Sequence, residues 1–280
     1  MAVNYEVRYP THPDDAKHYD TERLRKEYLV KDFLKNDEIY FVLSHYDRMM
    51  VGGAVPVTKP LTLETIEPLK APYFLERTEL GIINIGNTGK VSVDGKEFIL
   101  NRKDALYVGK GNKEVIFSSL DSANPARFYL NAAPAHKEFP TKLITLKDAE
   151  VVELGSSATS NQRRINKLMV NTVVETCQLQ MGMTELLSGS VWNTMPAHLH
   201  DRRMEVYFYF DVPENQAVCH FMGQPQETRH LWLHNEQAVL SPTWSIHCAT
   251  ATASYVFIWG MAGQNMNYGD MDVIQPTQLR

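Results

Sequence analysis

Short apolar runs that alternate with polar residues, separated by turn residues, fill much of the chain. Between residues 38 and 133 these runs are rich in β-branched and aromatic side chains, a pattern typical of strands. The predicted strands are Ile39–Ser44, Glu79–Ile85, Lys90–Val93, Glu97–Leu100, Glu114–Phe117 and Arg127–Leu130. Asp94-Gly95 between two of them predicts a tight hairpin. Because no long amphipathic helical pattern interrupts this rhythm, we expect a β-sandwich or barrel.

The rest of the chain divides into three further parts. Residues 1–37 are polar and contain one short predicted helix, Thr21–Tyr28, with Asp20 or Thr21 as its cap. A looser polar stretch at 134–170 predicts a linker, and the strand rhythm resumes in 171–280. We therefore predict an N-terminal arm (1–37), a first β-domain (38–133), a linker (134–170) and a second β-domain (171–280).

Composition and charge exclude several partners. The chain of 280 residues has a net charge of −5 and no basic block, so nucleic acid and anionic membranes are poor partners. The absence of an 18-residue apolar stretch predicts a soluble, cytoplasmic protein with no membrane contact. Cys177, Cys219 and Cys248 are odd in number and widely spaced, which favours buried thiols in a reducing compartment over disulfides.

Four residues in the second β-domain have the chemistry and spacing of a metal site. His198 and His200 are two residues apart, so on a strand both imidazoles leave the same face. Glu205 follows at the start of an otherwise aromatic and apolar segment, a costly place for an unpaired carboxylate. His247 lies 42 residues beyond Glu205, after a turn-like segment. Three imidazoles and a carboxylate suit zinc, manganese, iron, nickel or copper, and do not suit calcium or magnesium.

Two motifs around these residues resemble a known superfamily. His198-x-His200-x4-Glu205 resembles the first cupin motif, and the segment 242–247 resembles the second, although Trp192 and Trp244 stand where cupins usually carry glycine. Longer segments resemble the bacterial 5-keto-4-deoxyuronate isomerases of pectin breakdown. They are Trp192–Pro196, Arg202–Phe210, Met222–His230, His234–Val239, Phe74–Arg77 and Asp104–Gly111. The resemblance implies an all-β bicupin, with two double-sheet jelly-roll barrels and few short helices.

The resemblance also implies a function. A member of this family would be a metal-dependent aldose–ketose isomerase that converts 5-dehydro-4-deoxy-D-glucuronate to 3-deoxy-D-glycero-2,5-hexodiulosonate. One divalent transition metal per chain is expected, with Zn²⁺ as the first choice, bound by His198, His200, Glu205 and His247. Similar isomerases are homohexamers, so a homo-oligomer is expected.

Isomerisation needs a base, and a uronate needs a cation for its carboxylate. Tyr207 shares the face of Glu205 on a regular strand and is a candidate base, with a structural role as the alternative. Arg202, Arg203 and Arg229 are candidates for the carboxylate, because a guanidinium binds it bidentately. We expect at most one of the three to contact substrate.

The two β-domains show an internal similarity. Arg77-Thr78-Glu79-Leu80 takes the place in the first that Arg203-Met204-Glu205-Val206 takes in the second. This alignment puts Pro72, Phe74 and Glu114 of the first domain on His198, His200 and His247 of the second. The first β-domain is therefore predicted to be a cupin without metal ligands.

Three other functions remain compatible with these residues. The related 5-deoxyglucuronate isomerase of inositol catabolism is the nearest, and the segments around 195–200 and 222–227 favour the pectin enzyme over it. An iron-dependent cupin dioxygenase can use an identical ligand set. A non-enzymatic sugar-binding or regulatory cupin is the third, but no helix-turn-helix pattern or basic patch supports a regulator.

Overall fold

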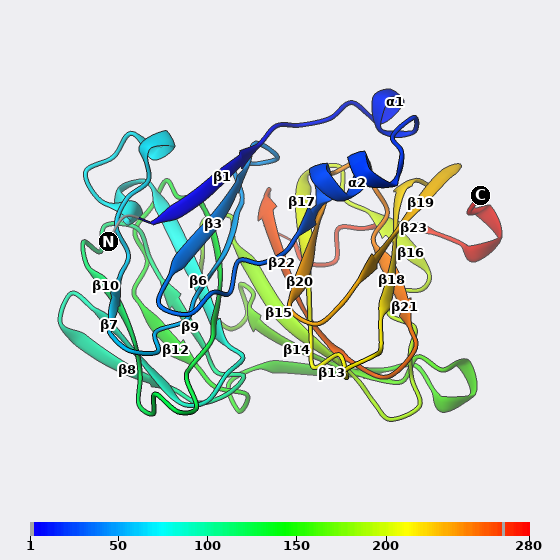
Figure 1. The fold of residues 1–280 in the computed structure, drawn as a ribbon. Coiled ribbons are helices and arrows are strands. Elements are labelled where there is room, and N and C mark those ends of the chain that lie inside the picture. The colour runs from blue at the N-terminus through cyan, green and yellow to red at the C-terminus, as the bar shows by residue number, and fades with distance from the viewer. Residues whose placement is uncertain (1–2, 265–266) are drawn as a thin grey trace. The chain divides into compact units, whose positions relative to one another are not determined.

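The computed structural model describes residues 3–264 and 267–280, and the chain divides into two compact units (Figure 1). Unit 1 comprises Met1–Arg8, Asp32–Glu150 and Leu168–Met181. Unit 2 comprises Tyr9–Lys31, Val151–Lys167 and Gly182–Arg280. Each unit is therefore assembled from three separate segments and not from one continuous half of the chain.

Unit 1 contains two sheets. A seven-stranded sheet has the order β1-β3-β4-β11-β6-β9-β12, and a four-stranded sheet has the order β5-β10-β7-β8. Its strands are β1 Asn4–Arg8, β3 Ile39–Ser44, β4 Met50–Ala54, β5 Leu61–Thr62, β6 Thr78–Asn84, β7 Gly89–Val93, β8 Lys96–Leu100, β9 Ala105–Val108, β10 Val115–Ser119, β11 Phe128–Pro134 and β12 Lys142–Ile144, with short 3-10 helices η1 Glu67–Leu69 and η2 Phe74–Glu76.

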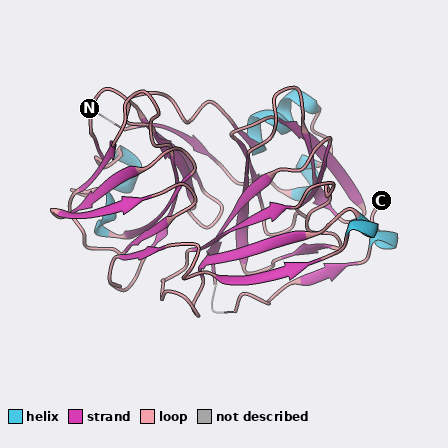
Figure 2. Cartoon of the chain, turned by 90° about the horizontal axis from the view of Figure 1, so that it is seen from below, coloured by secondary structure: helices cyan, strands magenta, loops and turns pink. Residues whose placement is uncertain are grey.

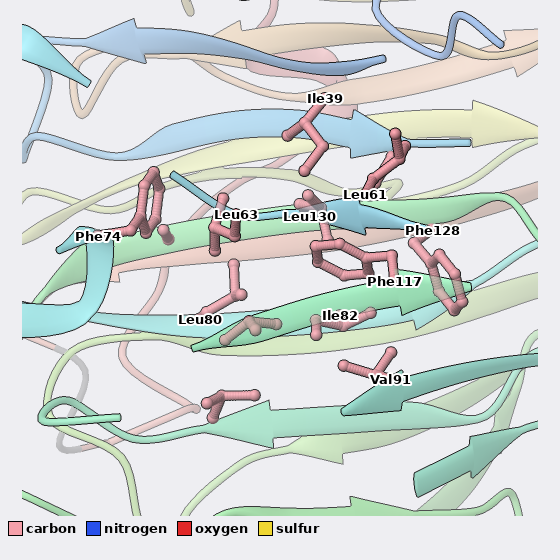
Figure 3. Close-up of a cluster of buried hydrophobic side chains, with 14 of the residues drawn as sticks. Ile39, Leu61, Leu63, Phe74, Leu80, Ile82, Val91, Phe117, Phe128 and Leu130 are labelled. Atoms are coloured by element: carbon pink, nitrogen blue, oxygen red, sulfur yellow. The ribbon is translucent and has the colours of Figure 1, made fainter. Parts of the chain in front are cut away.

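The core of unit 1 consists of apolar side chains that alternate along these strands (Figure 3). Leu80 and Ile82 of β6 belong to the buried cluster, together with Phe117 of β10 and Phe128 of β11. Phe117 and Phe128 contact each other with ring centroids 5.3 Å apart. The period of two along each strand places every second residue in this core, which explains why the pattern predicted strands so directly.

Unit 2 has a seven-stranded sheet, β13-β14-β15-β22-β17-β20-β2, a three-stranded sheet, β19-β18-β21, and the pair β16-β23. Its strands are β2 Leu29–Val30, β13 Glu150–Leu154, β14 Arg163–Met169, β15 Gln180–Leu186, β16 Ala197–Leu199, β17 Arg203–Phe210, β18 Val218–Gln224, β19 Glu227–Leu233, β20 Gln237–Ser241, β21 Cys248–Ala251, β22 Val256–Gly263 and β23 Asp272–Ile274. Its helices are α1 Pro13–Ala16, α2 Thr21–Tyr28, η3 Ser157–Thr159 and η4 Pro276–Gln278.

Two local predictions are confirmed in detail. Helix α2 spans Thr21–Tyr28, and the side chain of its N-cap Asp20 accepts a hydrogen bond from the backbone N–H of Arg23 at 2.8 Å. The hairpin between β7 and β8 turns at Asp94 and Gly95, both with positive φ, as a two-residue turn of this kind requires. Strands dominate and helices are few and short (Figure 2), which confirms the predicted all-β class. Among the described residues, no helix is long and apolar enough to cross a membrane.

The predicted domain boundaries differ from the observed units. The N-terminal arm contributes β1 to unit 1, where it pairs in parallel with β3, and contributes α2 and β2 to unit 2. The predicted linker at 134–170 contains β12, β13 and β14. β14 begins with Arg163 and Arg164 and also carries Asn166 and Lys167, and β13 lies at a sheet edge with much of its surface exposed. Such strands are polar enough to resemble coil in a sequence, which is why the prediction missed them.

A buried carboxylate ties distant segments of unit 1 together. Glu79 in β6 is fully buried on the face opposite Leu80. Its carboxylate accepts hydrogen bonds from four donors, namely the backbone N–H groups of Cys177, Gln178 and Leu179 at 2.8, 2.7 and 2.8 Å and the hydroxyl of Tyr107 at 2.7 Å. The side chain of Glu79 thus holds the segment Leu168–Met181 against strand β6 through three hydrogen bonds.

Candidate metal centre and cavity

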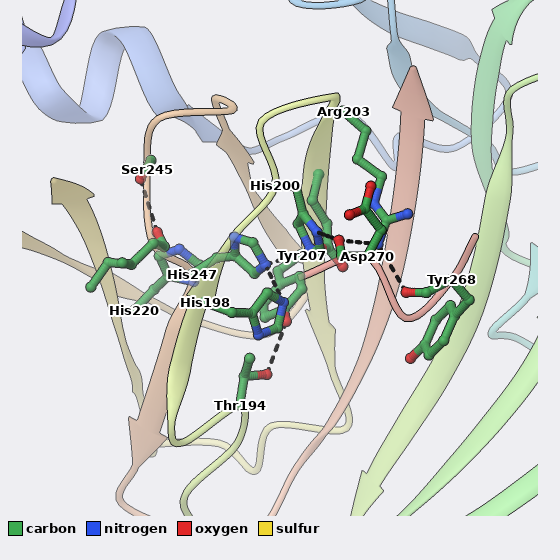
Figure 4. Close-up of polar contacts among 12 residues, drawn as sticks. Thr194, His198, His200, Arg203, Tyr207, His220, Ser245, His247, Tyr268 and Asp270 are labelled. Atoms are coloured by element: carbon green, nitrogen blue, oxygen red, sulfur yellow. Dashed lines mark hydrogen bonds and ion pairs between the residues drawn. The ribbon is translucent and has the colours of Figure 1, made fainter. Parts of the chain in front are cut away.

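Elements from three sheets of unit 2 bring the four predicted ligand residues together, and Figure 4 shows the three histidines side by side. His198 lies in β16, whose antiparallel partner β23 pairs it with Val273, and His200 follows directly after β16. Glu205 lies in the interior strand β17, between β20 and β22. His247 immediately precedes β21. One potential ligand atom from each of these side chains lies within 4.8 Å of the others.

The individual distances are short. Oε2 of Glu205 lies 3.0 Å from Nε2 of His200 and 2.8 Å from Nε2 of His247. Nε2 of His247 lies 2.9 Å from Nε2 of His198. Two ligand atoms at right angles on an ion, each about 2.1 Å from it, are about 3 Å apart. The donor set therefore has the spacing and chemistry of a transition-metal site, and its occupancy stays a prediction.

Burial and neighbouring groups shift the pKa values of two of the four side chains, His198 and Glu205. His200, Glu205 and His247 are at most 4% exposed. Burial, followed by the nearby His247 and His200, lowers the pKa of His198 well below its ordinary value. For Glu205, burial raises the pKa, but the charge of His247 and hydrogen bonds from His200 and His247 outweigh it and lower the pKa overall. An ionised carboxylate and neutral imidazoles are the forms required for coordination.

A backbone carbonyl orients His200. The Nδ1 atom of His200 lies 3.1 Å from the carbonyl oxygen of Asp270, so a proton on Nδ1 would leave Nε2 free to face the other ligands. The guanidinium of Arg203, 2% exposed, donates to the carbonyl oxygens of Asn267, Tyr268 and Asp270 at 2.9, 3.0 and 3.3 Å. Arg203 thus holds the segment that orients His200. Nδ1 of His247, by contrast, has no hydrogen-bond partner among the described residues.

A cavity of about 330 Å³ is lined by three of the four residues, His198, His200 and Glu205. Its apolar lining includes Phe257, Trp259 and Met261 of β22, and its polar lining includes Thr194 and Tyr207. The hydroxyl groups of Thr194 and Tyr207 lie 2.9 Å apart. Thr194 has a φ of 49°, an uncommon backbone conformation for a β-branched residue. Strained residues of this kind concentrate at functional sites, where the surrounding structure holds them in place.

The structure separates the three predicted arginines. Of these three, Arg203 alone lines the cavity in the part of the chain that the structure describes, and its Nη atoms donate to loop carbonyls. Arg202 is more than half exposed and forms an ion pair with the side chain of Asp270. Arg229 pairs with Glu227 and donates to the carbonyl of Lys17, beside a different and smaller pocket. The structure therefore does not bring Arg202 and Arg229 to the cavity.

Two cations that line the cavity were absent from the sequence prediction. Arg163 and Lys167 are four residues apart on β14, and Ile165 lies between them on the same face of the strand. Because the sequence analysis placed β14 in a linker, it did not consider which side chains of this segment share a face. The signal was present in the segment 163–168, where every second residue shares a face.

The internal repeat is supported by topology, but its alignment is wrong by one residue. The order β4-β11-β6-β9 in unit 1 matches β15-β22-β17-β20 in unit 2, so β6 corresponds to β17. Leu80 of β6 faces its core cluster and Glu205 of β17 faces the cavity, whereas Glu79 lies on the opposite face of β6. The interior position of the Glu205 carboxylate is therefore matched in unit 1 by the apolar Leu80.

The fold and this site define a cupin-like β-protein with a candidate metal centre. An IolB-like protein from Salmonella typhimurium has a similar structure, with a TM-score of 0.68, 14% identity, and coverage of 81% of this chain and 87% of the other. The oxalate decarboxylase of Lactobacillus farciminis matches with a TM-score of 0.57, 10% identity, and coverage of 81% and 79%. At these identities the likeness establishes the fold alone.

The chain belongs to the KduI/IolB family, whose model matches residues 28–274. A protein of Formosa agariphila named 4-deoxy-L-threo-5-hexosulose-uronate ketol-isomerase is 59% identical over 280 residues, all of both chains. Proteins with the same name from Bacteroides fragilis and Yersinia pestis are 57% identical over 100% of both chains, and 55% identical over 98% of this chain and 100% of theirs. These findings confirm the predicted family and the expectation of an enzyme of the ketol-isomerase class.

Proposed function

We propose that this chain is a metal-dependent ketol-isomerase that converts 5-dehydro-4-deoxy-D-glucuronate to 3-deoxy-D-glycero-2,5-hexodiulosonate. The observation that carries the proposal is identity of 55–59% over at least 98% of the chain to proteins named for this uronate. The four converging ligand-type side chains beside a cavity of about 330 Å³ supply a site of suitable chemistry and size. His198, His200, Glu205 and His247 would hold one divalent ion, with Zn²⁺ as the first expectation.

The reaction moves hydrogen between two neighbouring carbons of the sugar acid. Removal of the proton from the hydroxyl-bearing carbon gives an enediolate, which is protonated again at the former aldehyde carbon. When bound, a divalent metal would supply Lewis-acid polarisation of the carbonyl group. The apolar wall formed by Phe257, Trp259 and Met261 would limit access of water to the reacting carbons.

Tyr207 would act as a proton and hydrogen-bond donor. Burial and the nearby Glu205 raise the pKa of Tyr207 well above its ordinary value, so its hydroxyl is protonated at neutral pH. As a general base, the role for which Tyr207 was the sequence candidate, the phenol would first have to lose this proton, and that role stays a prediction. The hydroxyl of Thr194, 2.9 Å away, fixes the orientation of the phenol. A neutral phenol so placed would stabilise negative charge on a substrate oxygen in the enediolate.

The test combines metal content, product analysis and turnover. Purified protein should contain about one transition-metal ion per chain by elemental analysis, and a His198→Ala, His200→Ala double variant should contain much less. Metal-loaded protein should convert the uronate to the diulosonate, seen by NMR. Chelation should lower the rate by roughly a thousandfold or more with the fold intact, because carbonyl polarisation contributes several kcal/mol.

Three outcomes would overturn this proposal. Equal metal content in the wild type and the double variant would remove the site. Chelated protein that isomerises the uronate as fast as loaded protein would make the ion structural. If loaded protein left the uronate unchanged and consumed oxygen with another substrate and ferrous iron, an iron-dependent dioxygenase would replace the isomerase.

A second candidate is a 5-deoxyglucuronate isomerase. The description of the family joins KduI with IolB, and the IolB-like protein of Salmonella typhimurium shares the fold over 81% of this chain. Parallel assays with both uronates separate the candidates. We expect the 4-deoxy substrate to have the higher kcat/KM, because the relatives of 55–59% identity carry its name.

We also propose that copies of this chain form a homohexamer, as the sequence resemblance implies. Light scattering coupled to size-exclusion chromatography should give a mass of about six times 32.0 kDa. A monomeric mass at micromolar concentration would contradict the assembly without affecting the proposed reaction.

A further inference from the structure

Two cationic side chains on one face of strand β14 line the cavity. Arg163, Ile165 and Lys167 occupy alternate positions and all line it. Arg164 lies between them on the other face, where its guanidinium is 46% exposed and donates to the carboxylate of Glu153 at 3.1 and 2.9 Å. Neighbouring arginines on one strand therefore have opposite surroundings, one facing the cavity and one facing solvent.

Arg163 has no acidic partner in the part of the chain that the structure describes. Its Nη1 atom donates to the carbonyl oxygen of Asn161 at 2.8 Å. The ionisable groups close enough to affect it are the tyrosines Tyr207, Tyr255 and Tyr268, and no carboxylate is among them. A guanidinium has five N–H donors, so most of those of Arg163 remain available to a ligand in the cavity. Placing an anion against a partly buried guanidinium without a counter-ion is electrostatically favourable.

The other cations of the cavity are already engaged. The ammonium of Lys167 lies 4.6 Å from the ring centroid of Tyr268, a cation–π contact. The guanidinium of Arg203 is committed to three carbonyl oxygens of the segment 267–270. Of the three cations, Arg163 thus has the most N–H donors available for an anionic ligand.

We propose that Arg163 binds the carboxylate of an acidic sugar in this cavity and selects uronates over neutral sugars. This inference rests on the proposed isomerase function and names the residue behind its substrate class. A carboxylate matches the planar fork of a guanidinium and can accept two parallel hydrogen bonds from it. The substrate would then be held at two places, with its carboxylate on β14 and its carbonyl end beside the four ligand residues.

The first test is steady-state kinetics with the uronate on three variants. Arg163→Gln removes the charge, Arg163→Lys keeps the charge without the fork, and Arg164→Gln removes the same charge from the outer face of β14. We expect Arg163→Gln to raise KM by roughly 10- to 100-fold, with a smaller change in kcat. Arg163→Lys should lie between it and the wild type, and Arg164→Gln should stay within about twofold of wild type.

The second test measures binding without turnover. Calorimetric titration of metal-free protein with D-glucuronate and with D-glucose compares an acidic and a neutral sugar of the same size. The wild type and Arg164→Gln should bind glucuronate more tightly than glucose, and Arg163→Gln should lose that preference while keeping its circular dichroism spectrum.

The outcomes separate this inference from the function on which it rests. A wild type that does not isomerise the uronate contradicts the proposed function, while the glucuronate preference still reports on Arg163. A wild-type KM in Arg163→Gln, or an unchanged preference for glucuronate in that variant, would overturn the role of Arg163. An equal loss of binding for both sugars in Arg163→Gln would also overturn the role of Arg163, because it would show a general change of cavity shape. If Arg163→Gln did not fold, the same readouts on Arg163→Lys would decide.

Discussion

The hydroxyl of Thr194 lies 2.9 Å from that of Tyr207, and the two residues approach the cavity from different elements. Tyr207 lies on strand β17, two residues after Glu205, and Thr194 lies in the segment that leads into β16. The contact aims a buried, protonated phenol at the space beside the ligand residues. It therefore links a strained backbone position to the proposed chemistry.

Replacing Tyr207 by Phe should slow turnover without emptying the metal site. We expect kcat to fall by about 100-fold or more, because a positioned proton donor contributes about that much. The metal content should stay at the wild-type value. Tyr209→Phe is the matched control, since Tyr209 shares the strand and face but donates to or accepts from His220 at 2.7 Å, and it should keep most of the activity. Equal rates for Tyr207→Phe and wild type would exclude the donor role.

Replacing Arg203 by Met should weaken metal binding. The variant loses the hydrogen bonds that hold the carbonyl of Asp270 against His200, and loss of such an orienting partner costs roughly 10- to 100-fold in affinity. Competition with a chromophoric chelator measures this affinity. Arg202→Met is the control, because its ion pair with Asp270 is on the surface and should matter little. Identical affinities for both variants would show that the loop carbonyl does not orient His200.

Unit 1 should depend strongly on Glu79. Glu79→Gln replaces a buried carboxylate that accepts from four donors, and we expect a loss of about 2–4 kcal/mol in the free energy of unfolding. Tyr107→Phe removes one of the donors and should cost about 1–2 kcal/mol. Glu97→Gln, whose partner Lys90 is on an exposed hairpin, should stay within about 0.5 kcal/mol of wild type. Urea unfolding provides the measurement, and equal effects of Glu79→Gln and Glu97→Gln would contradict the prediction.

The free energy of unfolding should decrease as the pH is lowered, because His220 is buried in its neutral form. Burial lowers the pKa of His220 to about 3, from its ordinary 6.5. Between these values the unfolded chain binds a proton that the folded protein does not. The contribution is therefore complete above pH 6.5 and is lost as pH falls toward 3, by up to about 1.4 kcal/mol per pH unit.

The variant His220→Gln isolates this contribution. Urea unfolding of metal-free protein at several pH values from 7 to 5 should give a shallower pH dependence for His220→Gln than for wild type. His234→Gln changes an exposed histidine of the same unit and should follow the wild type. A pH dependence in His220→Gln as steep as in wild type would assign the effect to other groups.

Features that depend on neighbouring residues were predictable from the sequence. Helix α2 with its Asp20 cap and the Asp94-Gly95 hairpin depend on interactions among residues two or three positions apart. The convergence of His198, His200, Glu205 and His247 was predictable, because ligand-type residues at a motif spacing carry their own chemistry. The all-β class followed from the period of two along most strands.

Other features were decided only by tertiary structure. The pairing of β16 with β23, the parallel addition of β1 to β3 and the orientation of His200 by the carbonyl of Asp270 all use backbone groups, which every residue carries. Which arginine faces the cavity depends on strand register, and this separates Arg163 from Arg164 although they are adjacent. The sequence by itself therefore determined most of the strands and the residue types of the candidate metal site. The tertiary structure determined which cations and carbonyls surround them, because long-range backbone pairing sets those positions without a side-chain signature.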